Sequence, residues 1–443
     1  LGVLAKTEHN EVAPAQHELA PIFTTTNIAA DHNQLTMEMM KKTALKHGLV
    51  CLLHEKPFDG VNGSGKHNNW SLSTDTGVNF LSPGKNPSEN SLFLLTLAAV
   101  IRAVDEHQDL LRISVATAGN DHRLGANEAP PAIISMFLGD ELTGVLEAIE
   151  NGVHHDDAKR VKMTVGADII PFIRRDNTDR NRTSPFAFTG NKFEFRMLGS
   201  ASSISDTNVM LNTMVADVFA EFADRLENAA NFEKELNLII KETVKAHKRI
   251  IFNGDGYSDD WQAEAQKRGL LNLKSTVDAL PLLKSEENIA MFERHGVLSR
   301  AEINSRVDIV LENYCKVLHI EALTLIEMMN RQVIPAISEY TDRLCTALSH
   351  KRALNINADE SADREIIARL SAAGSEIYKL TGDLKMAVSS AEKIADMLEK
   401  ATAYHDIVLK LMTDIRKYAD SSEAVVSMDV WPYPSYGELL FSI

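Results

Sequence analysis

The sequence predicts a mixed α/β (α+β) protein. We expect a curved, mainly antiparallel sheet or partial barrel with helices on its outer side, followed by a long all-helical C-terminal extension. Two observations predict this. Most of the glycines and prolines, and the short β-rich runs, lie before residue 200, whereas long stretches with helical apolar spacing dominate after it. We therefore expect two domains, residues 1–200 and residues 201–443.

Three helices are expected in the first part. The first covers Asp31 to Lys46 and is closed by Gly48, because a glycine readily adopts the left-handed conformation that ends helices. The second runs from Ser88 to about Asp109 and carries an apolar stripe. The third, residues 140–150, is closed in the same way by Gly152.

Two stretches between these helices have strand character. Residues 47–58 form an apolar run, and residues 192–198, KFEFRML, alternate strictly between charged and apolar side chains. This alternation puts Glu194 and Arg196 on one face of the strand and aromatic rings on the other. If the aromatic face packs on the core, the charged face points to solvent or into a ligand cavity.

Residues 201–443 are predicted to be helical and to serve as a scaffold or an assembly surface. Ser299 and Glu302 form a capping box before a helix that runs toward Pro335. Residues 361–418 are amphipathic and contain two glycines but no proline, which is typical of long helices laid side by side or of a hairpin arm. The exception is the acidic loop 252–261, FNGDGYSDDW, which suits either a cation or a solvated turn.

Composition excludes several classes of protein. The 62 acidic residues exceed the 46 basic ones by 16, which argues against a general nucleic-acid-binding surface. No apolar run approaches the ~18 residues of a membrane helix. Cys51, Cys315 and Cys345 are scattered, as expected for a reduced cytoplasmic protein. No signal peptide is recognisable, and because the chain starts with Leu1 inside a motif-like stretch, we expect the natural N-terminus to be missing.

Residues 10–19, NEVAPAQHEL, place two carboxylates on either side of a proline. If Pro14 and Ala15 form a two-residue hairpin loop, Glu11 lies directly opposite Glu18. Opposed side chains have Cβ atoms roughly 5 Å apart, where like charges are destabilising. A hard divalent cation between them would reverse that effect, since it binds carboxylate oxygens. The alternative is an open loop with two solvated glutamates.

Residues 62–72, NGSGKHNNWSL, form a glycine-rich loop. Gly63 and Gly65 let backbone N–H groups approach an anion or polar ligand closely. His67 follows the loop directly, and Trp70 has a ring that can stack on a base. No Lys-Ser/Thr pair closes the loop, so it is not a Walker motif. A glycine-serine loop without a ligand is the alternative.

Two later stretches supply cations and carboxylates. Residues 120–132 contain Arg123, whose guanidinium can form two parallel hydrogen bonds to a carboxylate or phosphate. They also contain Glu128, a candidate general base. The alternative is that the two residues form an ion pair on the surface. Residues 179–197 surround Glu194 with four cations: Arg180, Arg182, Lys192 and Arg196. Together the motifs provide carboxylates and a histidine for a hard divalent metal and arginines for phosphate. This combination predicts ATP-dependent phosphoryl transfer.

In their order and spacing, these four motifs resemble those of glutamine synthetase, in its long type III form. The paired-glutamate segment, the glycine-histidine motif, the arginine-glutamate flap and the RNR and FEFR segments fall within residues 1–200. The loop at 252–261, the helical extension and the ending WPYPSYGELLF extend the resemblance over the whole chain. It implies synthesis of L-glutamine from L-glutamate, ammonia and ATP through a γ-glutamyl phosphate, with Mg²⁺ or Mn²⁺.

The resemblance also implies the roles of individual residues. Four residues would hold two metal ions: Glu11 and Glu18 the first, His67 and Glu194 the second. The glutamate substrate would contact Asn62, Gly63, Arg123 and Arg196. ATP would contact Asn69, Trp70, Ser71, Arg182 and Lys192. The catalytic residues would be Glu128, which takes a proton from ammonium, Arg123 and Arg182.

Three departures accompany the resemblance. Asn69 stands where many relatives have a second histidine, and Ala187 stands where a further phosphate arginine is expected, a loss for which Lys192 can compensate. The family's other metal carboxylates lie upstream of the paired glutamates, so residues 1–200 are an incomplete catalytic domain.

Finally, the resemblance implies a cytoplasmic homo-oligomer, a dodecamer of two stacked hexameric rings. The alternatives are a γ-glutamyl-amine ligase and a catalytically silent fragment or scaffold subunit.

Overall fold

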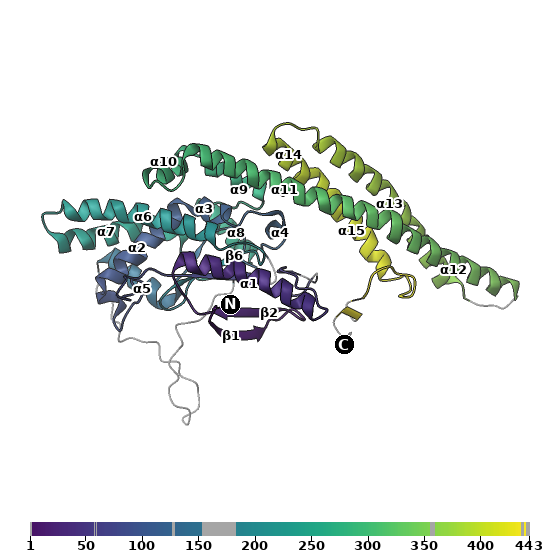
Figure 1. Ribbon diagram of the computed structural model, residues 1–443, viewed down its shortest axis with the longest axis horizontal. Helices are drawn as coiled ribbons and strands as arrows, with labels where there is room; N and C mark the ends of the chain where they lie inside the picture. The colour runs from purple at the N-terminus through teal and green to yellow at the C-terminus, as the bar shows by residue number, and fades with distance from the viewer. Residues whose placement is uncertain are drawn as a thin grey trace, which may run out of the picture. The chain divides into compact units, whose positions relative to one another are not determined.

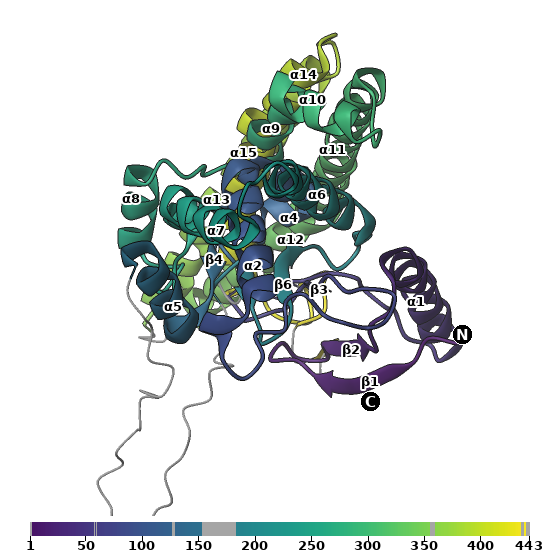
Figure 2. The same cartoon turned by 90° about the vertical axis from the view of Figure 1, so that its left-hand side faces the viewer.

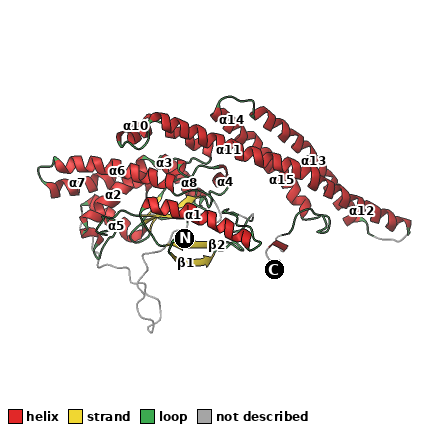
Figure 3. Ribbon diagram, viewed as in Figure 1, coloured by secondary structure: helices red, strands yellow, loops and turns green. Residues whose placement is uncertain are grey.

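The computed structural model describes residues 2–56, 58, 60–125, 129–152, 183–354, 359–435 and 438–439. The chain divides into two compact units, Leu1–Asn304 and Ser305–Ile443, here called unit 1 and unit 2. All named strands lie in unit 1, and helices make up most of the drawing in both units (Figures 1 and 3). The expected change in character near residue 200 is confirmed, because the last named strand ends at Leu198.

Unit 1 contains two small sheets. The first is a hairpin of β1 (Ala5–Asn10) and β2 (His17–Pro21), seen at the edge of the drawing in Figure 2. The second has the strand order β3-β6-β5-β4, made of β3 (Lys66–Trp70), β4 (Met136–Phe137), β5 (Phe186–Phe188) and β6 (Phe193–Leu198). Among the pairings between these described strands, β4–β5 is the parallel one. The mainly antiparallel pairing is therefore confirmed, and neither sheet closes into a barrel among the described residues.

Helices pack around the second sheet. The apolar helix α2 (Ser91–Glu106) is mostly buried and packs against α6 (Ser205–Glu227) and α7 (Phe232–His247). The helix expected at 88–109 breaks at His107, after which α3 (Gln108–Ile113) begins. The other helices of unit 1 are α1 (Thr26–Lys46), η1 (Pro87–Glu89), α4 (Ala118–Asp121), α5 (Gly139–Asn151), η2 (Lys248–Ile250), α8 (Asp259–Lys267), α9 (Thr276–Ala279), η3 (Leu280–Lys284) and α10 (Glu286–Arg294).

The expected glycine stops are found where the sequence places them. Gly48 follows the end of α1 with a φ of 71°, and Gly152 follows α5 with a φ of 67°. Both values lie in the left-handed region, where a side chain would be strained. The start of α1 differs from expectation, because the helix begins at Thr26, five residues before Asp31.

The strand expected at residues 47–58 is wrong for the described part of that stretch. Residues 49–54 are irregular, and Leu49, Val50 and Leu52 are 64%, 75% and 71% exposed. An apolar run becomes a strand only where a neighbouring strand supplies ladder hydrogen bonds. No described residue of the chain offers this stretch a strand partner, so its composition alone did not determine its structure.

Unit 2 is built from long helices. The helix α11 (Arg300–Met328) starts at the end of unit 1 after the expected capping box, in which the Ser299 N–H donates to Glu302 Oε2 at 2.8 Å. Helices α12 (Ile334–Ala353) and α15 (Lys410–Glu423) both pack against α13 (Ser361–Ala391). The remaining elements are η4 (Met329–Val333), α14 (Met397–Ala403) and η5 (Tyr404–Leu409).

The helical character expected for residues 201–443 is confirmed. The strand contacts after residue 205 in the described chain are isolated bridges, Ile133 with Asn272 and Met136 with Ile251. Helices α6 and α7 belong to unit 1, so the division into domains at residue 200 stays a prediction. None of the described helices has both the length and the apolar composition needed to cross a membrane.

Candidate metal and substrate site

The hairpin turns where the sequence predicts, but with a different register. The Gln16 N–H donates to the Ala13 carbonyl at 3.1 Å, and Ala15 has a φ of 53°, as in a β-turn with proline at its second position. The Glu11 N–H then donates to the Gln16 carbonyl at 2.9 Å. The loop therefore takes four residues instead of two. The direct opposition of Glu11 and Glu18 is wrong, because Glu18 pairs with His9.

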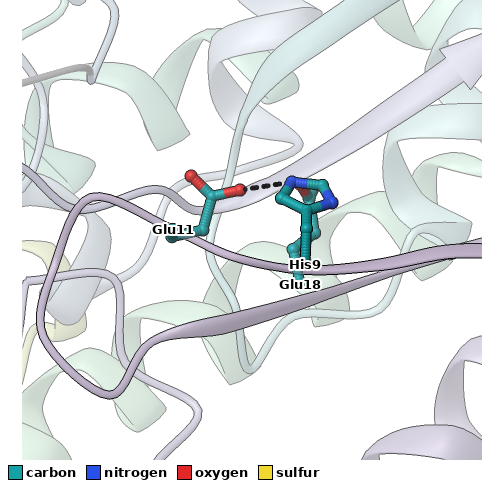
Figure 4. A group of neighbouring side chains, drawn as sticks. All are labelled: His9, Glu11 and Glu18. Carbon is teal, nitrogen blue, oxygen red and sulfur yellow. Dashed lines mark hydrogen bonds and ion pairs between the residues drawn. The ribbon is translucent and has the colours of Figure 1, made fainter.

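The two glutamates nevertheless come together, with His9 between them (Figure 4). His9 Nε2 lies 2.9 Å from Glu11 Oε1 and 2.8 Å from Glu18 Oε2. Partial burial raises the pKa of Glu18, and a hydrogen bond with Glu11 raises it further, while the charge of His67 lowers it. The surroundings of Glu18 therefore do not fully stabilise the negative charge of its ionised form.

His67 and Glu194 form the second predicted pair. The β3–β6 ladder is irregular between Lys66 and Asn68, so His67 sits at the shift in register. Its Nδ1 lies 2.8 Å from Glu194 Oε1, and Arg196 Nη2 donates to Glu194 Oε2 at 2.9 Å. Glu194 and Arg196 are each only 4% exposed. The charged face of β6 therefore points into the protein and not to solvent.

The charge of Glu194 is strongly favoured. Burial by itself raises the pKa of this carboxyl, but the hydrogen bond with His67 and the positive charge of Arg196 bring it down to about 2. Glu194 is consequently a preorganised anion at neutral pH. His67 also lies close enough to Glu18 for its positive charge to lower the pKa of that carboxyl.

The glycine loop is fixed to the hairpin by one side chain. Gln16 Nε2 donates to the Ser64 carbonyl at 3.2 Å, and the Ser64 N–H donates to Gln16 Oε1 at 3.0 Å. A Cβ on Gly63 would lie 2.1 Å from the carbonyl oxygen of Glu55, and a Cβ on Gly65 would lie 2.6 Å from Arg123 Cζ. Both glycines are needed because other chain segments approach their backbone closely.

Arg123 lies behind this loop and is 3% exposed. Its guanidinium donates to the carbonyls of Arg196 at 2.8 Å and Leu198 at 2.9 Å, which anchors the end of β6. Burial lowers the pKa of Arg123, while the negative charge of Glu55 raises it. Glu55 is itself buried and accepts a hydrogen bond from the Ser200 N–H. In this structure Arg123 has a structural task, and its contact with substrate stays a prediction.

The remaining predicted site residues are distributed around this centre. Asn62 is half-buried in the loop, whereas Asn69 and Ser71 are exposed on either side of Trp70. Trp70 is 4% exposed and donates from Nε1 to Asn212 of α6 at 2.9 Å, so its ring packs in the core. Lys192 lies partly exposed beside the β5–β6 turn. Three predicted residues lie outside the described residues: Glu128, Arg180 and Arg182.

Sequence reasoning missed three residues that the structure brings to the site: His9, Gln16 and Glu55. A signal for His9 exists in the sequence, because it precedes Glu11 by two residues and side chains two apart share one face of a strand. No comparable local pattern marks Gln16 or Glu55. Their roles depend on chain segments about forty or more residues away, such as Ser64 and Ser200.

Two groups of side chains could hold a metal ion. In the first, His9, Glu11 and Glu18 each offer a ligand atom within 4.8 Å of the others. In the second, His67 and Glu194 lie in direct contact. Carboxylate oxygens with imidazole nitrogen and no thiolate fit Mg²⁺ or Mn²⁺ better than a structural zinc ion. The residues present are thus chemically suited to a hard divalent cation.

Comparison with known proteins identifies two matching family models. "Glutamine synthetase, catalytic domain" matches residues 1–134, and "Glutamine synthetase C-terminal domain" matches residues 235–352. The second match lies in the helical extension. The two matched ranges begin on either side of the expected boundary near residue 200.

Three similar relatives align with all of this chain. They are a "Glutamine synthetase" of Butyrivibrio fibrisolvens at 49% identity, a "Type-3 glutamine synthetase" of Dictyostelium discoideum at 45% and a "Glutamine synthetase" of Bacteroides fragilis at 42%. The alignments cover 63%, 61% and 62% of these relatives. The chain therefore spans less than two thirds of the length of each relative.

Proposed function

We propose, from the premise that this chain belongs to the glutamine synthetase family, that the protein of which it forms part joins ammonia to L-glutamate. The reaction consumes ATP and yields L-glutamine, ADP and phosphate. The side-chain carboxylate of glutamate attacks the γ-phosphorus of ATP, and ammonia then displaces phosphate from the acyl phosphate. The observation that carries this proposal is the 49% identity over the full chain with a glutamine synthetase. A γ-glutamyl-amine ligase is not favoured by the names of these relatives.

The proposed metal-binding residues are Glu11 and Glu18 for one ion and His67 and Glu194 for the other. When bound, Mg²⁺ or Mn²⁺ would neutralise phosphate oxygens and assist transfer of the phosphoryl group. The preorganised charge of Glu194 supports its role as a ligand, because no proton must leave it at neutral pH. The raised pKa of Glu18 supports a role for the other pair, since a cation would relieve the cost of ionising it.

The proposed substrate contacts follow the resemblance. For glutamate they are Asn62, Gly63, Arg123 and Arg196, and for ATP they are Asn69, Trp70, Ser71, Arg182 and Lys192. Glu128 would accept the proton that ammonium loses before attack. Access to Arg123 and Trp70 would require a rearrangement, because both side chains are buried and hydrogen-bonded. For these two residues a positioning role is better supported than direct contact.

The site proposed here would be completed in a larger assembly. We infer a homo-oligomer, with a dodecamer of two stacked hexameric rings as the specific arrangement, and a cytoplasmic location. The support is family membership. Sedimentation velocity of the complete protein tests the assembly, and a mass of twelve subunits is expected.

The test of the reaction is phosphate release by the complete protein with Mg²⁺. Release should require glutamate and ammonium together, and one glutamine should form per phosphate. Glu194→Gln should abolish turnover, whereas Glu360→Gln, far away in sequence in unit 2 and paired there with Arg352 and Arg364, should leave it unchanged. Phosphate release without glutamine formation, or with methylamine in preference to ammonium, would overturn the proposal.

A further inference from the structure

We propose that Asn212, on helix α6, is a positioning residue for nucleotide binding, and that it acts by holding strand β3 through Trp70. This inference rests on the proposed function, in which Asn69 and Ser71 contact ATP. It gives a role in the reaction to α6, which lies in the part of the chain that the sequence predicts to be a scaffold or an assembly surface.

Strand β3 has two faces with different surroundings. Successive side chains of a strand point to opposite faces. Asn68 and Trp70 are 5% and 4% exposed, whereas Asn69 and Ser71, which alternate with them, are exposed. The exposed face is therefore open to a ligand, and the buried face is the one by which the protein holds the strand.

Three side chains on the buried face of β3 bond to one segment of the chain. The donors, two residues apart along the strand, are Lys66 Nζ, Asn68 Nδ2 and Trp70 Nε1. Their acceptors, in the same order, are the Ser202 carbonyl, Asn208 Oδ1 at 3.1 Å and Asn212 Oδ1 at 2.9 Å. Asn208 and Asn212 lie about one turn apart on α6 and share one of its faces. These six residues are here called the β3–α6 row.

The β3–α6 row compensates for incomplete backbone pairing of β3. Among the described strands, β3 lies at the edge of its sheet and pairs with β6. That ladder is irregular between Lys66 and Asn68, so the backbone bonds are interrupted where the strand begins. The side-chain bonds to α6 therefore give β3 the second support that a neighbouring strand would otherwise provide. At the other end of the strand this support is the bond between Trp70 and Asn212.

The opposing interpretation is that the β3–α6 row stabilises the fold without affecting a ligand. The two interpretations differ in which ligand responds. The predicted glutamate contacts Asn62 and Gly63 lie in the glycine loop, which is held by bonds between Gln16 and Ser64 and not by α6. Loss of the Asn212 bond should therefore weaken nucleotide binding and spare glutamate binding. A general loss of structure would weaken both.

The experiment is isothermal titration calorimetry of the complete protein with ADP and Mg²⁺, and separately with L-glutamate. Asn212→Leu keeps the approximate size of the side chain and removes the acceptor of the Trp70 N–H. Nucleotide affinity should fall about three- to tenfold, the equivalent of one net hydrogen bond, because the nucleotide would then have to order β3 itself. Glutamate affinity should stay within about twofold. Asn212 is exposed, so the substitution should leave the fold intact.

A conservative variant and a matched control complete the design. Asn212→Asp keeps an oxygen that accepts the Trp70 N–H, so its nucleotide affinity should lie within about twofold of the parent. The control is Asn228→Leu at the other end of α6, because Asn228 bonds to the Asp224 carbonyl of the same helix at 2.7 Å. It should bind both ligands like the parent.

Two results would overturn the proposal: unchanged nucleotide affinity in Asn212→Leu, or equal losses of nucleotide and glutamate affinity. Equal losses in Asn212→Leu and Asn212→Asp would also overturn it, since the bond to Trp70 would then not be the cause. Neither titration uses glutamine formation. A parent protein that binds nucleotide but forms no glutamine would refute the proposed reaction alone, so the two failures are seen separately.

Discussion

Replacement of Glu194 by glutamine should destabilise unit 1 by about 3 kcal/mol at neutral pH in the absence of metal. The substitution keeps the shape of the side chain and removes its charge, and with it the ion pair with the buried guanidinium of Arg196. The pKa of Glu194 is lowered from 4.5 to about 2. Because one pKa unit corresponds to about 1.4 kcal/mol, the two states differ by roughly 3 kcal/mol.

The sign of the pH dependence follows from the lowered pKa. A carboxyl that is more acidic in the folded protein stabilises it above the unfolded pKa of 4.5, and this stabilisation is lost as the pH falls through 2. At pH 3 about two fifths of the effect should therefore remain. The difference between the parent and Glu194→Gln should shrink accordingly between pH 7 and pH 3.

The assay is urea unfolding in EDTA, followed by tryptophan fluorescence. Trp70 and Trp261 both report on unit 1, whereas Trp431 lies in unit 2, so the measurements use a Trp431→Phe background. With a slope of about 3 kcal/mol per molar urea, the midpoint should fall by about 1 M. The matched control is Glu18→Gln, which should be no less stable than the parent, because burial and Glu11 raise the pKa of Glu18.

Two results would refute this reasoning. A loss below about 1 kcal/mol at pH 7 would mean that the His67 and Arg196 contacts do not favour the ionised carboxyl as the geometry indicates. Equal losses at pH 7 and pH 3 would mean that the substitution acts through packing and not through charge. Either result would also weaken the case for Glu194 as a preorganised metal ligand.

The remaining predictions use other parts of the chain. Millimolar Mn²⁺ should raise the thermal midpoint of the parent and not that of the Glu11→Gln, Glu18→Gln double variant, and equal shifts would show that these glutamates do not bind it. Asp121→Ala should cost about 3–5 kcal/mol in urea unfolding, because Arg112 is fully buried and bonds to this carboxylate at 2.8 Å; restored stability in Arg112→Met with Asp121→Ala is the check. Burial raises the pKa of Cys315 to about 11, so its alkylation at pH 8 should be at least about 100-fold slower in the folded chain than in urea, and comparable rates would contradict this.

The sequence predicted those features that depend on neighbouring residues. The turn at Pro14 and Ala15, the glycine ends of α1 and α5 and the capping box before α11 are all local, and all are found. The register of the hairpin was missed. A two-residue loop and a four-residue loop can share the same tip, and in the observed one the Gln16 side chain bonds to the distant Ser64.

Features that depend on distant segments were harder to predict. The apolar run at 49–54 has strand composition but no described strand beside it. The buried state of Arg123 depends on three backbone carbonyls of residues 196–198, which its own motif does not reveal. By contrast, the proximity of His67 and Glu194 could be predicted. The resemblance to a family assigns both residues to one metal ion, although they lie far apart in the sequence.

The two carboxylates Glu18 and Glu194 show how the same residue type serves two tasks in one site. Glu194 is neutralised within the protein by Arg196 and His67, so its charge is stable without any ion. Glu18 has a close acidic neighbour and a raised pKa, so its charge is costly until a cation arrives. A divalent ion should therefore gain most of its binding energy from the hairpin pair. On this argument the hairpin responds to metal, while the sheet residue Glu194 provides a fixed charge that exists before the ion binds.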